Sequence, residues 1–560
     1  MEKSPKTYTR AQESTNAIEK LYISMRHLFA RGFYKPMGVS GASLRKSLLV
    51  LRPEIYGSIA EDKIELNGLV YVVERLPQGI EECQFINLTA DEGFKDSNFT
   101  PIVPEKRRRN CYRIDKDQMN IEITRGRSEI YDILTHLTFL FIESHKIQER
   151  VTINEGEDFI REWKILEDVV VHKKSMNDEE RQVLLVHLVN ILGRKLEEIV
   201  KIHQAFSNSS NPDRFLEIIY WLGKLAINEV LEGEKRTITF SSALVEEIGH
   251  HIYGEIWAND IKGFLHEKHL LDRPIHIISA NMHSVMNSIY AKEALGYESK
   301  KDRPFELFQR LSDSGSKTLR KKVEEYASNN GLYYLDDTSG TNIDVQIIDT
   351  RKIKHLSSSF YEGKSEKEYP VILVMDYAFG EQAYETMDEL LKPLQTDADK
   401  IYLDIQSVSI MGKAGILEGG KGDIMIPSAH IFEGTADNYP FKNELSKEDL
   451  EGFGVDVYDG SMITVLGTSL QNKDLLKFFY ESTWNVVGLE MEGAHYQKAI
   501  QSASRIRGNI SKNVKVRYAY YASDNPLETG ATLASGGLGL TGVIPTYAIT
   551  QKIVEQILEQ

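Results

Sequence analysis

The spacing of apolar side chains in the first half of the chain predicts mainly helices. Apolar positions recur every three or four residues, the period of an amphipathic helix, over 9–31, 38–53, 127–145, 177–206, 212–231 and 241–256. Between about 64 and 124 the pattern becomes strand-like, in the runs IELNGLVYVVERL, QFINL and NIEITRG. Residues 1–270 are therefore expected to form a mostly helical N-terminal domain with a small β insert.

From Arg273 onwards the pattern changes to an alternation of strands and helices. Short apolar runs lead into a polar loop and a helix-like segment, as in RPIHIISANMHSVMN and PVILVMDYAFGEQAYETM. Further strands are expected in KIYLDIQSVSIM, GDIMIPSAHIF, SMITVLGTS, VVGLEMEG and VRYAYYASD, and a long helix over 305–329. This alternation is typical of a mostly parallel or mixed sheet flanked by helices. Residues 271–560 are therefore expected to form an α/β domain that binds its ligand at the carboxyl ends of the strands.

Length and composition limit the classes of protein to which the chain can belong. Its 560 residues suffice for two or three domains, and 41% hydrophobic with 27% charged residues fits a globular protein. A formal net charge of -16 argues against nucleic acid as a partner. Cys83 and Cys111 are too few for a disulfide framework, and no signal peptide, membrane-length apolar run or cluster of metal ligands stands out. We expect a cytoplasmic protein without membrane contacts and without a metal or other cofactor.

The stretch VVGLEMEG places two acids around a methionine at the end of an expected strand. The carboxylate of Glu492 can accept hydrogen bonds from both vicinal hydroxyls of a ribose, and the Met491 thioether offers an apolar floor for the sugar. A fixed negative charge there also stabilises an oxocarbenium-like transition state. The alternative is a solvated glutamate in the first turn of a helix, where it stabilises the helix N-terminus.

A second acid follows the last expected strand, in the step Ser523-Asp524-Asn525-Pro526. A carboxyl group near N7 of a purine can act as general acid for the departing base. Asp524 would have to hold a proton near neutral pH, which burial beside tyrosines favours. The alternative is an N-cap, since Ser-Asp-Asn after a strand is good capping chemistry.

Two loops of the α/β domain carry glycines that allow close approach to a ligand. SIMGKAGILEGGKGD contains Lys413, which can hold a phosphate as a point charge, and Gly415; the alternative for Lys413 is a surface position on a turn. DYAFGEQ contains Gly380, before a helix whose N-terminal N–H groups would face an anion. Glu381 in the same loop argues against an anion there.

Three further sets of polar residues are candidates for contact with the sugar phosphate or the attacking water. Asn281 and His283 follow the first expected strand, in SANMHSVMN, although a lone histidine is more often structural. Arg125 and Arg127, in ITRGRSEIYDILTHL, have guanidinium groups that match phosphate geometry. A solvated arginine pair at a helix start is the alternative, and the run 107–109 is a second basic candidate.

These stretches, in this order, resemble the superfamily of purine nucleoside phosphorylases and nucleosidases. The resemblance implies that Met491 and Glu492 hold the ribose, that Ser523 and Asp524 hold the purine, and that the chain forms a homo-oligomer. The tail SDNPLETGATLASGG, the Met-His step and the Ile-Thr-Arg step are similar to AMP nucleosidases. This narrower likeness implies hydrolysis of AMP to adenine and ribose 5-phosphate, a reaction of nucleotide metabolism and purine salvage.

Two alternatives remain open. The first is a phosphorylase or nucleosidase acting on unphosphorylated nucleosides, with inorganic phosphate as a further ligand in the phosphorylase. The arginine-bearing phosphate loop of phosphorylases is not evident after either of the first two strands of the α/β domain, which favours water. The second is a non-catalytic nucleotide-binding or regulatory protein. It is suggested by the large helical domain and by the lack, around Asn281 and His283, of the acid that activates water in many nucleosidases.

Overall fold

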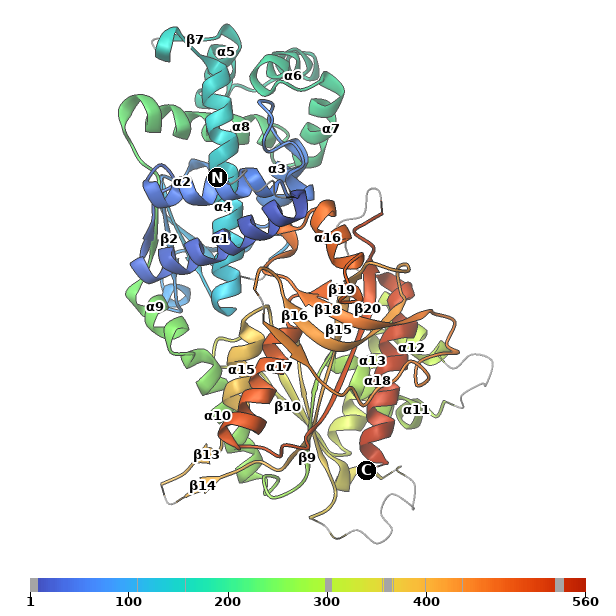
Figure 1. The fold of residues 1–560 in the computed structure, drawn as a ribbon. Coiled ribbons are helices and arrows are strands. Elements are labelled where there is room, and N and C mark those ends of the chain that lie inside the picture. Colours follow the sequence, from blue (N-terminus) through green and yellow to red (C-terminus); the bar gives the residue numbers. More distant parts are fainter. Residues whose placement is uncertain are drawn as a thin grey trace, which may run out of the picture. The chain divides into compact units, whose positions relative to one another are not determined.

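The structure is a computed structural model and describes residues 9–107, 109–156, 158–297, 305–354, 356, 365, 367–397, 399–435, 437–528 and 538–559. Its first compact unit consists of Met1–Thr124, Glu129–His250 and Ser469–Leu475, and its second of Arg125–Ser128, His251–Thr468 and Leu476–Gln560. Each unit is described by itself below, with elements labelled as in Figure 1. Residues 529–537, most of the tail SDNPLETGATLASGG, lie outside the described residues.

The first unit packs helices around a mixed six-stranded sheet. Its helices are α1 (Arg10–Arg31), α2 (Val39–Leu51), α3 (Leu66–Val73), α4 (Gly126–Val151), α5 (Arg161–Val171), α6 (Asp178–Leu192), α7 (Leu196–Phe206), α8 (Arg214–Ile227) and α9 (Ser242–Gly249). Its strands are β1 (Phe33–Tyr34), β2 (Phe85–Thr89), β3 (Pro101–Ile102), β4 (Cys111–Asp115), β5 (Gln118–Glu122), β6 (Thr152–Ile153), β7 (Asp158–Phe159) and β8 (Thr237–Phe240). The sheet runs β1-β8-β2-β5-β4-β3, and β6 pairs with β7 alone.

The prediction of a strand over the run IELNGLVYVVERL is wrong, because most of this run forms helix α3. Its valines and tyrosine favour a strand, but the Glu65 carboxylate caps a helix by accepting from Asn67 N at 3.1 Å and from Gly68 N at 3.3 Å. Leu66, Leu69 and Val72 then fall on one buried face at helical spacing. Capping and burial together outweigh the residue preferences.

Three segments expected as single helices are each divided in two. Residues 177–206 form α6 and α7, because Gly193 adopts a left-handed φ of 66° that ends the first helix. Residues 241–256 contain α9 and the start of α10, with His251 at a φ of 57° between them. Residues 305–329 form α12 and α13, separated by a short 3-10 turn.

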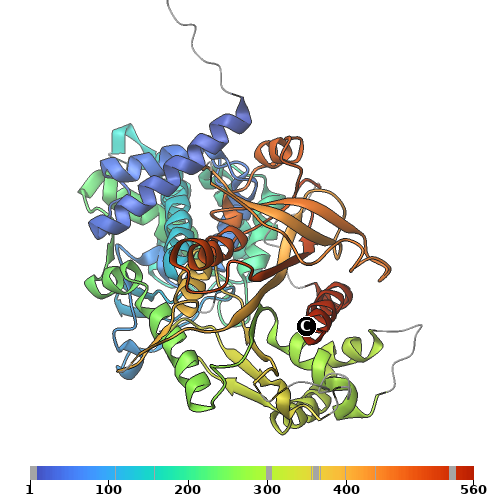
Figure 2. The ribbon, with the colours of Figure 1, turned by 60° about the horizontal axis from the view of Figure 1, so that its bottom comes forward.

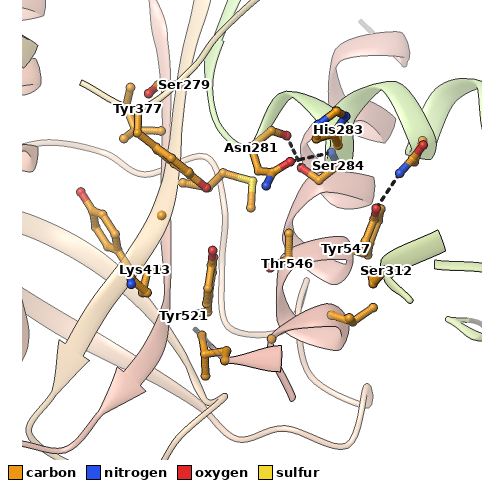
Figure 3. A pocket seen from close by; sticks show the side chains of 18 of the residues that line it. Ser279, Asn281, His283, Ser284, Ser312, Tyr377, Lys413, Tyr521, Thr546 and Tyr547 are labelled. Atoms are coloured by element: carbon orange, nitrogen blue, oxygen red, sulfur yellow. Dashed lines mark hydrogen bonds between the residues drawn. The ribbon is translucent and has the colours of Figure 1, made fainter. Parts of the chain in front are cut away.

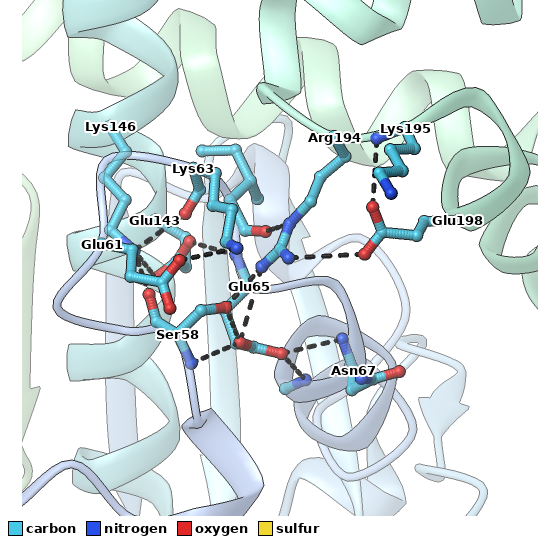
Figure 4. A network of polar contacts seen from close by, with 12 residues as sticks. Ser58, Glu61, Lys63, Glu65, Asn67, Glu143, Lys146, Arg194, Lys195 and Glu198 are labelled. Atoms are coloured by element: carbon cyan, nitrogen blue, oxygen red, sulfur yellow. Dashed lines mark hydrogen bonds and ion pairs between the residues drawn. The ribbon is translucent and has the colours of Figure 1, made fainter.

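A buried polar network fastens the 58–65 loop of the first unit to α4 (Figure 4). The Glu143 carboxylate accepts from Glu65 N and from Lys146 Nζ, each at 2.8 Å. The Glu65 carboxylate accepts from Ser58 N at 2.7 Å, and Arg194 Nε donates to Ile64 O at 2.6 Å. Burial raises the pKa of Glu143 to about 7. All partners in this network belong to the first unit.

The second unit is an α/β domain. Its helices are α10 (Ile252–Glu267), α11 (Met282–Leu295), α12 (Glu306–Ser312), α13 (Lys317–Ser328), α15 (Gln382–Leu390), α16 (Lys473–Tyr480), whose first turn belongs to the first unit, α17 (Gly493–Gln501) and α18 (Val543–Leu558). Its strands are β9 (Ile275–Ser279), β10 (Leu332–Leu335), β11 (Val345–Asp349), β12 (Val371–Met375), β13 (Leu394–Gln395), β14 (Lys400–Ile401), β15 (Ile405–Ile416), β16 (Ile424–Phe432), β17 (Asn438–Pro440), β18 (Val457–Thr464), β19 (Val486–Glu490) and β20 (Lys515–Asp524).

The main sheet of the second unit is mixed. Its order is β10-β11-β12-β9-β15-β19-β18-β16-β17, and β20 pairs with both β15 and β16. Strands β9, β12, β15 and β20 run parallel where they pair, as do β16, β18 and β19, whereas β10, β11 and β17 join antiparallel. Because β20 joins β15 to β16, the strands β15, β19, β18, β16 and β20 pair in a closed ring.

Helices cover both faces of this sheet (Figures 1 and 2). On one face α10, α15 and α17 bury residues such as Ile261, Met387 and Tyr496 against the strands. On the other face α11, α12, α13 and α18 bury Val285, Phe308 and Ile549. Although the sequence placed α10 before a boundary near 270, its apolar face packs into the core of the second unit.

Candidate active site

A cavity of about 780 Å³ lies at the carboxyl ends of three strands of the second unit. The residue two positions after the end of each strand lines this cavity: Asn281 after β9, Tyr377 after β12 and Glu492 after β19. Lys413 and Tyr521, partners in the β15/β20 ladder, also line it (Figure 3). α/β sheets bind ligands at this edge, so the cavity is the candidate active site.

Glu492 is held in place by backbone N–H groups on both sides of its carboxylate. Gly380 N donates to Oε1 at 2.9 Å, and Met491 N lies 3.3 Å from Oε2. Burial, together with the negative charge of Glu490, raises the pKa of Glu492 to about 8. The side chain is thus fixed in one orientation at the cavity wall.

Glu490, the other acid of the Glu-Met-Glu step, lies in a different environment. Its carboxylate is buried and accepts from Thr464 Oγ1, Glu492 N and Gly493 N, each at 2.5 Å. Burial raises the pKa of Glu490 to about 7. Glu490 shapes the turn that begins α17, while Glu492 lines the cavity.

The loop that carries Gly380 is braced by residues 125–128, which cluster with the second unit. Ser128 Oγ accepts from Glu381 N at 2.8 Å, and Arg127 Nη1 pairs with the Glu381 carboxylate at 3.0 Å. Among the described residues that line the cavity, neither Arg125 nor Arg127 is found. The Glu381 carboxylate, expected to disfavour an anion in this loop, instead pairs with one of the arginines proposed to bind phosphate.

Replacing Gly380 with alanine is expected to destabilise the second unit. Gly380 adopts a left-handed φ of 56°, and an added Cβ would lie 2.3 Å from Ser128 Oγ. Gly296 has nearly the same φ, 58°, with nothing within 4 Å of an added Cβ, so Gly296→Ala reports the backbone strain alone. In denaturant unfolding, the free energy of unfolding of Gly380→Ala should be about 1–3 kcal/mol lower than that of Gly296→Ala. Equal losses for the two variants would contradict this packing.

Asn281 and His283 stand at the start of α11, and both are exposed to the cavity. Asn281 is the N-cap of this helix, with its Oδ1 3.3 Å from Ser284 N (Figure 3). The cap fixes the Asn281 side chain, whereas His283 is turned to the open space. Both residues therefore lie where a ligand or an attacking water can reach them.

Lys413 and Gly415 were expected in a glycine loop, but both belong to strand β15. The turn with the closely spaced glycines comes later, at 417–423. Lys413 is exposed in the cavity, and a register shift follows it at Ala414 and Gly415. The strand continues through these glycines because it pairs with β20 on one side and with β19 on the other.

Ser523 and Asp524 end β20 and are both buried. Ser523 Oγ lies 3.1 Å from Ala414 O and 2.5 Å from Asp524 Oδ1. Asp524 is not among the described residues that line the cavity, although Tyr520 and Tyr521 of its strand are. Gly415 pairs with Leu489 on one side and with Asp524 on the other. At 4.7–4.9 Å per strand, the backbones of β19 and Asp524 are therefore about 10 Å apart there.

The structure adds cavity residues that were not predicted from the sequence. Tyr496 lies one helical turn after Glu492, and its hydroxyl is 3.1 Å from Ser279 Oγ. The four-residue spacing from Glu492 on a helix start was a usable signal for it. Arg320 comes from α13, outside every motif, and no sequence signal pointed to it.

No group of three or more His, Cys, Asp or Glu side chains within the described residues is arranged to hold a metal ion. Over the described part of the chain, no helix combines the length and the apolar composition of a membrane span.

Comparison with solved structures gives weak likenesses to about half of the chain. The 5'-methylthioadenosine/S-adenosyl homocysteine nucleosidase of Campylobacter jejuni is 10% identical, with a TM-score of 0.30, over 51% of this chain and 100% of that one. The futalosine hydrolase of Helicobacter pylori is 13% identical, with a TM-score of 0.31, over 51% and 99%. A uridine phosphorylase of Schistosoma mansoni is 12% identical, with a TM-score of 0.33, over 53% and 92%.

Comparison with families and with curated proteins gives one match. No curated protein matches the chain. Residues 42–295 and 306–559 match a family described as a family of unknown function, DUF6909. Since the matched residues make up most of both units, the chain belongs to the DUF6909 family.

Proposed function

We propose that this protein hydrolyses the N-glycosidic bond of a purine nucleotide, with AMP as the preferred substrate. The observation that carries the proposal is the position of Glu492 on the cavity wall just beyond β19, with β15 alone between β19 and the Ser523–Asp524 end of β20. Sugar and base are neighbouring parts of one nucleotide, so the polar groups that bind them must lie within the length of one ligand. The order of the sequence motifs supports the same assignment.

In the proposed reaction, water attacks C1′ of the ribose and the bond from C1′ to N9 of the base breaks. The oxygen and one hydrogen of the water stay on the sugar, and the other hydrogen ends on the base, so AMP and water give ribose 5-phosphate and adenine. The Glu492 carboxylate accepts the two ribose hydroxyls and stabilises positive charge on the sugar ring. Asp524 supplies the proton to the base.

Base release from a panel of substrates tests this proposal. The native protein is incubated with AMP, adenosine, IMP and GMP, with and without inorganic phosphate, and the free base and the sugar product are identified. We expect adenine and ribose 5-phosphate from AMP, at a rate independent of phosphate. Ribose 1-phosphate formed from adenosine would assign the site to a phosphorylase. Tight binding of AMP without base release would assign it to a non-catalytic binding protein.

The activity is expected to rise with pH up to about pH 8. Glu492 must be ionised to accept both hydroxyls, and its pKa is raised to about 8 by burial and by Glu490. Below that pH the group carries a proton, so kcat/KM should fall by about tenfold for each unit of pH. Initial rates at low substrate concentration from pH 6 to 9 measure this fall of kcat/KM at low pH. The Glu492→Gln variant should not show the fall. A native profile that is flat over this range would contradict the assignment.

A further inference from the structure

One end of the cavity is lined by α11, α18, the end of α12 and the first turn of α13. Helices α11 and α18 are joined by two contacts: Ser284 Oγ lies 3.0 Å from Thr550 Oγ1, and Asn287 Nδ2 donates to Tyr547 Oη at 2.9 Å. Tyr547 also stacks on Phe308 of α12, with the ring centroids 4.0 Å apart. We call this region the α11–α18 end.

The α11–α18 end is separate from the wall formed by the β15/β20 ladder. Figure 3 shows His283, Ser312 and Tyr547 on one side of the cavity, and Tyr377 with Lys413 on the other. A ligand bound at Glu492 and reaching towards α11 and α18 would therefore place a distinct chemical group there.

Arg320 of α13 brings a positive charge to this end. Its Nη1 donates to Leu311 O at 2.8 Å and to Asp313 O at 2.6 Å. These are neutral carbonyl groups, and within the described part of the chain no acidic side chain forms an ion pair with Arg320. Nη2 also lies 3.4 Å from Ser314 O. An arginine held by neutral groups alone can still pair with an anionic ligand. Glu492 is the sole acid among the described cavity residues.

Two other features of the α11–α18 end bear on the ligand that it would bind. Helices α11 and α18 both begin at the cavity, and neither has an acid in its first turn. Their N-termini carry the partial positive charge of the helix dipole. In addition, Asn287 is only 4% exposed, lines the cavity, and has no hydrogen-bond partner for Oδ1 among the described residues. A buried polar atom without a partner indicates a missing ligand group, and because Oδ1 is an acceptor it suits a hydroxyl of the ligand and not a phosphate oxygen.

We propose that the α11–α18 end binds the phosphate of the nucleotide substrate and that Arg320 makes the site selective for nucleotides over nucleosides. The identity of the rest of the ligand rests on the proposed function. A phosphate fits because its oxygens accept from a guanidinium and from helix N-terminal N–H groups at the same time. Arg320 thus takes the phosphate contact that the sequence assigned to Arg127, whose guanidinium pairs with Glu381.

Binding of three probes to the full chain tests this inference without requiring turnover. Calorimetry is used to compare AMP, adenosine and inorganic phosphate on the native protein, on Arg320→Gln, and on Arg310→Gln as the control. Arg310 is an exposed arginine of the neighbouring α12 and is not among the described cavity residues. A lost charge-assisted contact should weaken AMP binding by about 10- to 100-fold in Arg320→Gln. Binding of adenosine should stay within about twofold, and Arg310→Gln should match the native protein.

The outcomes separate this inference from the proposed function. Native protein that binds AMP no more tightly than adenosine, or binds neither, would overturn the inference. So would an equal loss for AMP and adenosine in Arg320→Gln, because Arg320 would then only maintain the fold at the ends of α12 and α13. If inorganic phosphate binds to native protein and loses affinity in Arg320→Gln while AMP does not, the subsite holds free phosphate and the inference fails. AMP binding that depends on Arg320 without any base release would uphold the inference and reject the proposed hydrolysis.

Discussion

Glu492→Gln is expected to lower kcat/KM for AMP by about 10²- to 10³-fold. The amide keeps the size of the side chain but loses the negative charge that faces the sugar. It also presents an N–H₂ group where two hydroxyls need acceptors, and it can no longer accept from both Gly380 N and Met491 N. Initial rates of adenine release measure the change. Because the loss concerns charge in the transition state, kcat should fall more than KM rises.

Glu293→Gln provides the control for this substitution. Glu293 is an exposed residue of α11, outside the described cavity residues, and undergoes the same chemical change. Its activity should equal that of the native protein. If Glu492→Gln retained activity within about threefold of native, Glu492 would not be the sugar ligand. The first-turn alternative, a glutamate that only stabilises α17, would then be correct.

Asp524→Asn is expected to lower kcat for AMP by about 10²- to 10⁴-fold while leaving AMP binding nearly unchanged. Asparagine preserves the shape and can keep a contact with Ser523 Oγ, but it cannot supply a proton to the departing base. The rate of adenine release under saturating AMP measures the effect, and calorimetry measures the binding.

The nature of the leaving group gives a control for Asp524. A purine nucleotide methylated at N7 releases a neutral base that needs no proton. The defect of Asp524→Asn should therefore shrink on that substrate, to about tenfold or less. An equal defect on both substrates would mean that Asp524 shapes the end of β20 and takes no part in proton transfer.

Several strands of the second unit were predictable because each apolar run is bounded by polar residues. β9, β12, β16 and β19 lie within expected runs, whereas β20 begins one residue and β18 four residues before the expected run. Local pattern was insufficient where capping decided the outcome, as at α3, where the Glu65 carboxylate turns a valine-rich run into a helix. It also missed the helix break at Gly193, since a glycine within a periodic segment can be tolerated or can end the helix.

The candidate site was only partly predictable for a different reason. Glu492, Asn281 and His283 follow strands of one sheet, so strand order sufficed to gather them. Arg127 pairs with Glu381, 254 residues away in the sequence, and no local pattern reports such a partner. Lys413 was expected in a loop because glycines flank it, yet pairing with two neighbouring strands extends β15 through them. Arg320 belongs to no motif and reaches the cavity only through the packing of α13.

The most direct measurement is a crystal structure of the Asp524→Asn variant with AMP bound. We expect the ribose hydroxyls within hydrogen-bond distance of the Glu492 carboxylate, and the N7 edge of the adenine beside the residue at position 524. The phosphate should lie at the start of α11 and α18, beside Arg320. A nucleotide bound at another place on the chain, or one whose ribose does not touch Glu492, would contradict the account.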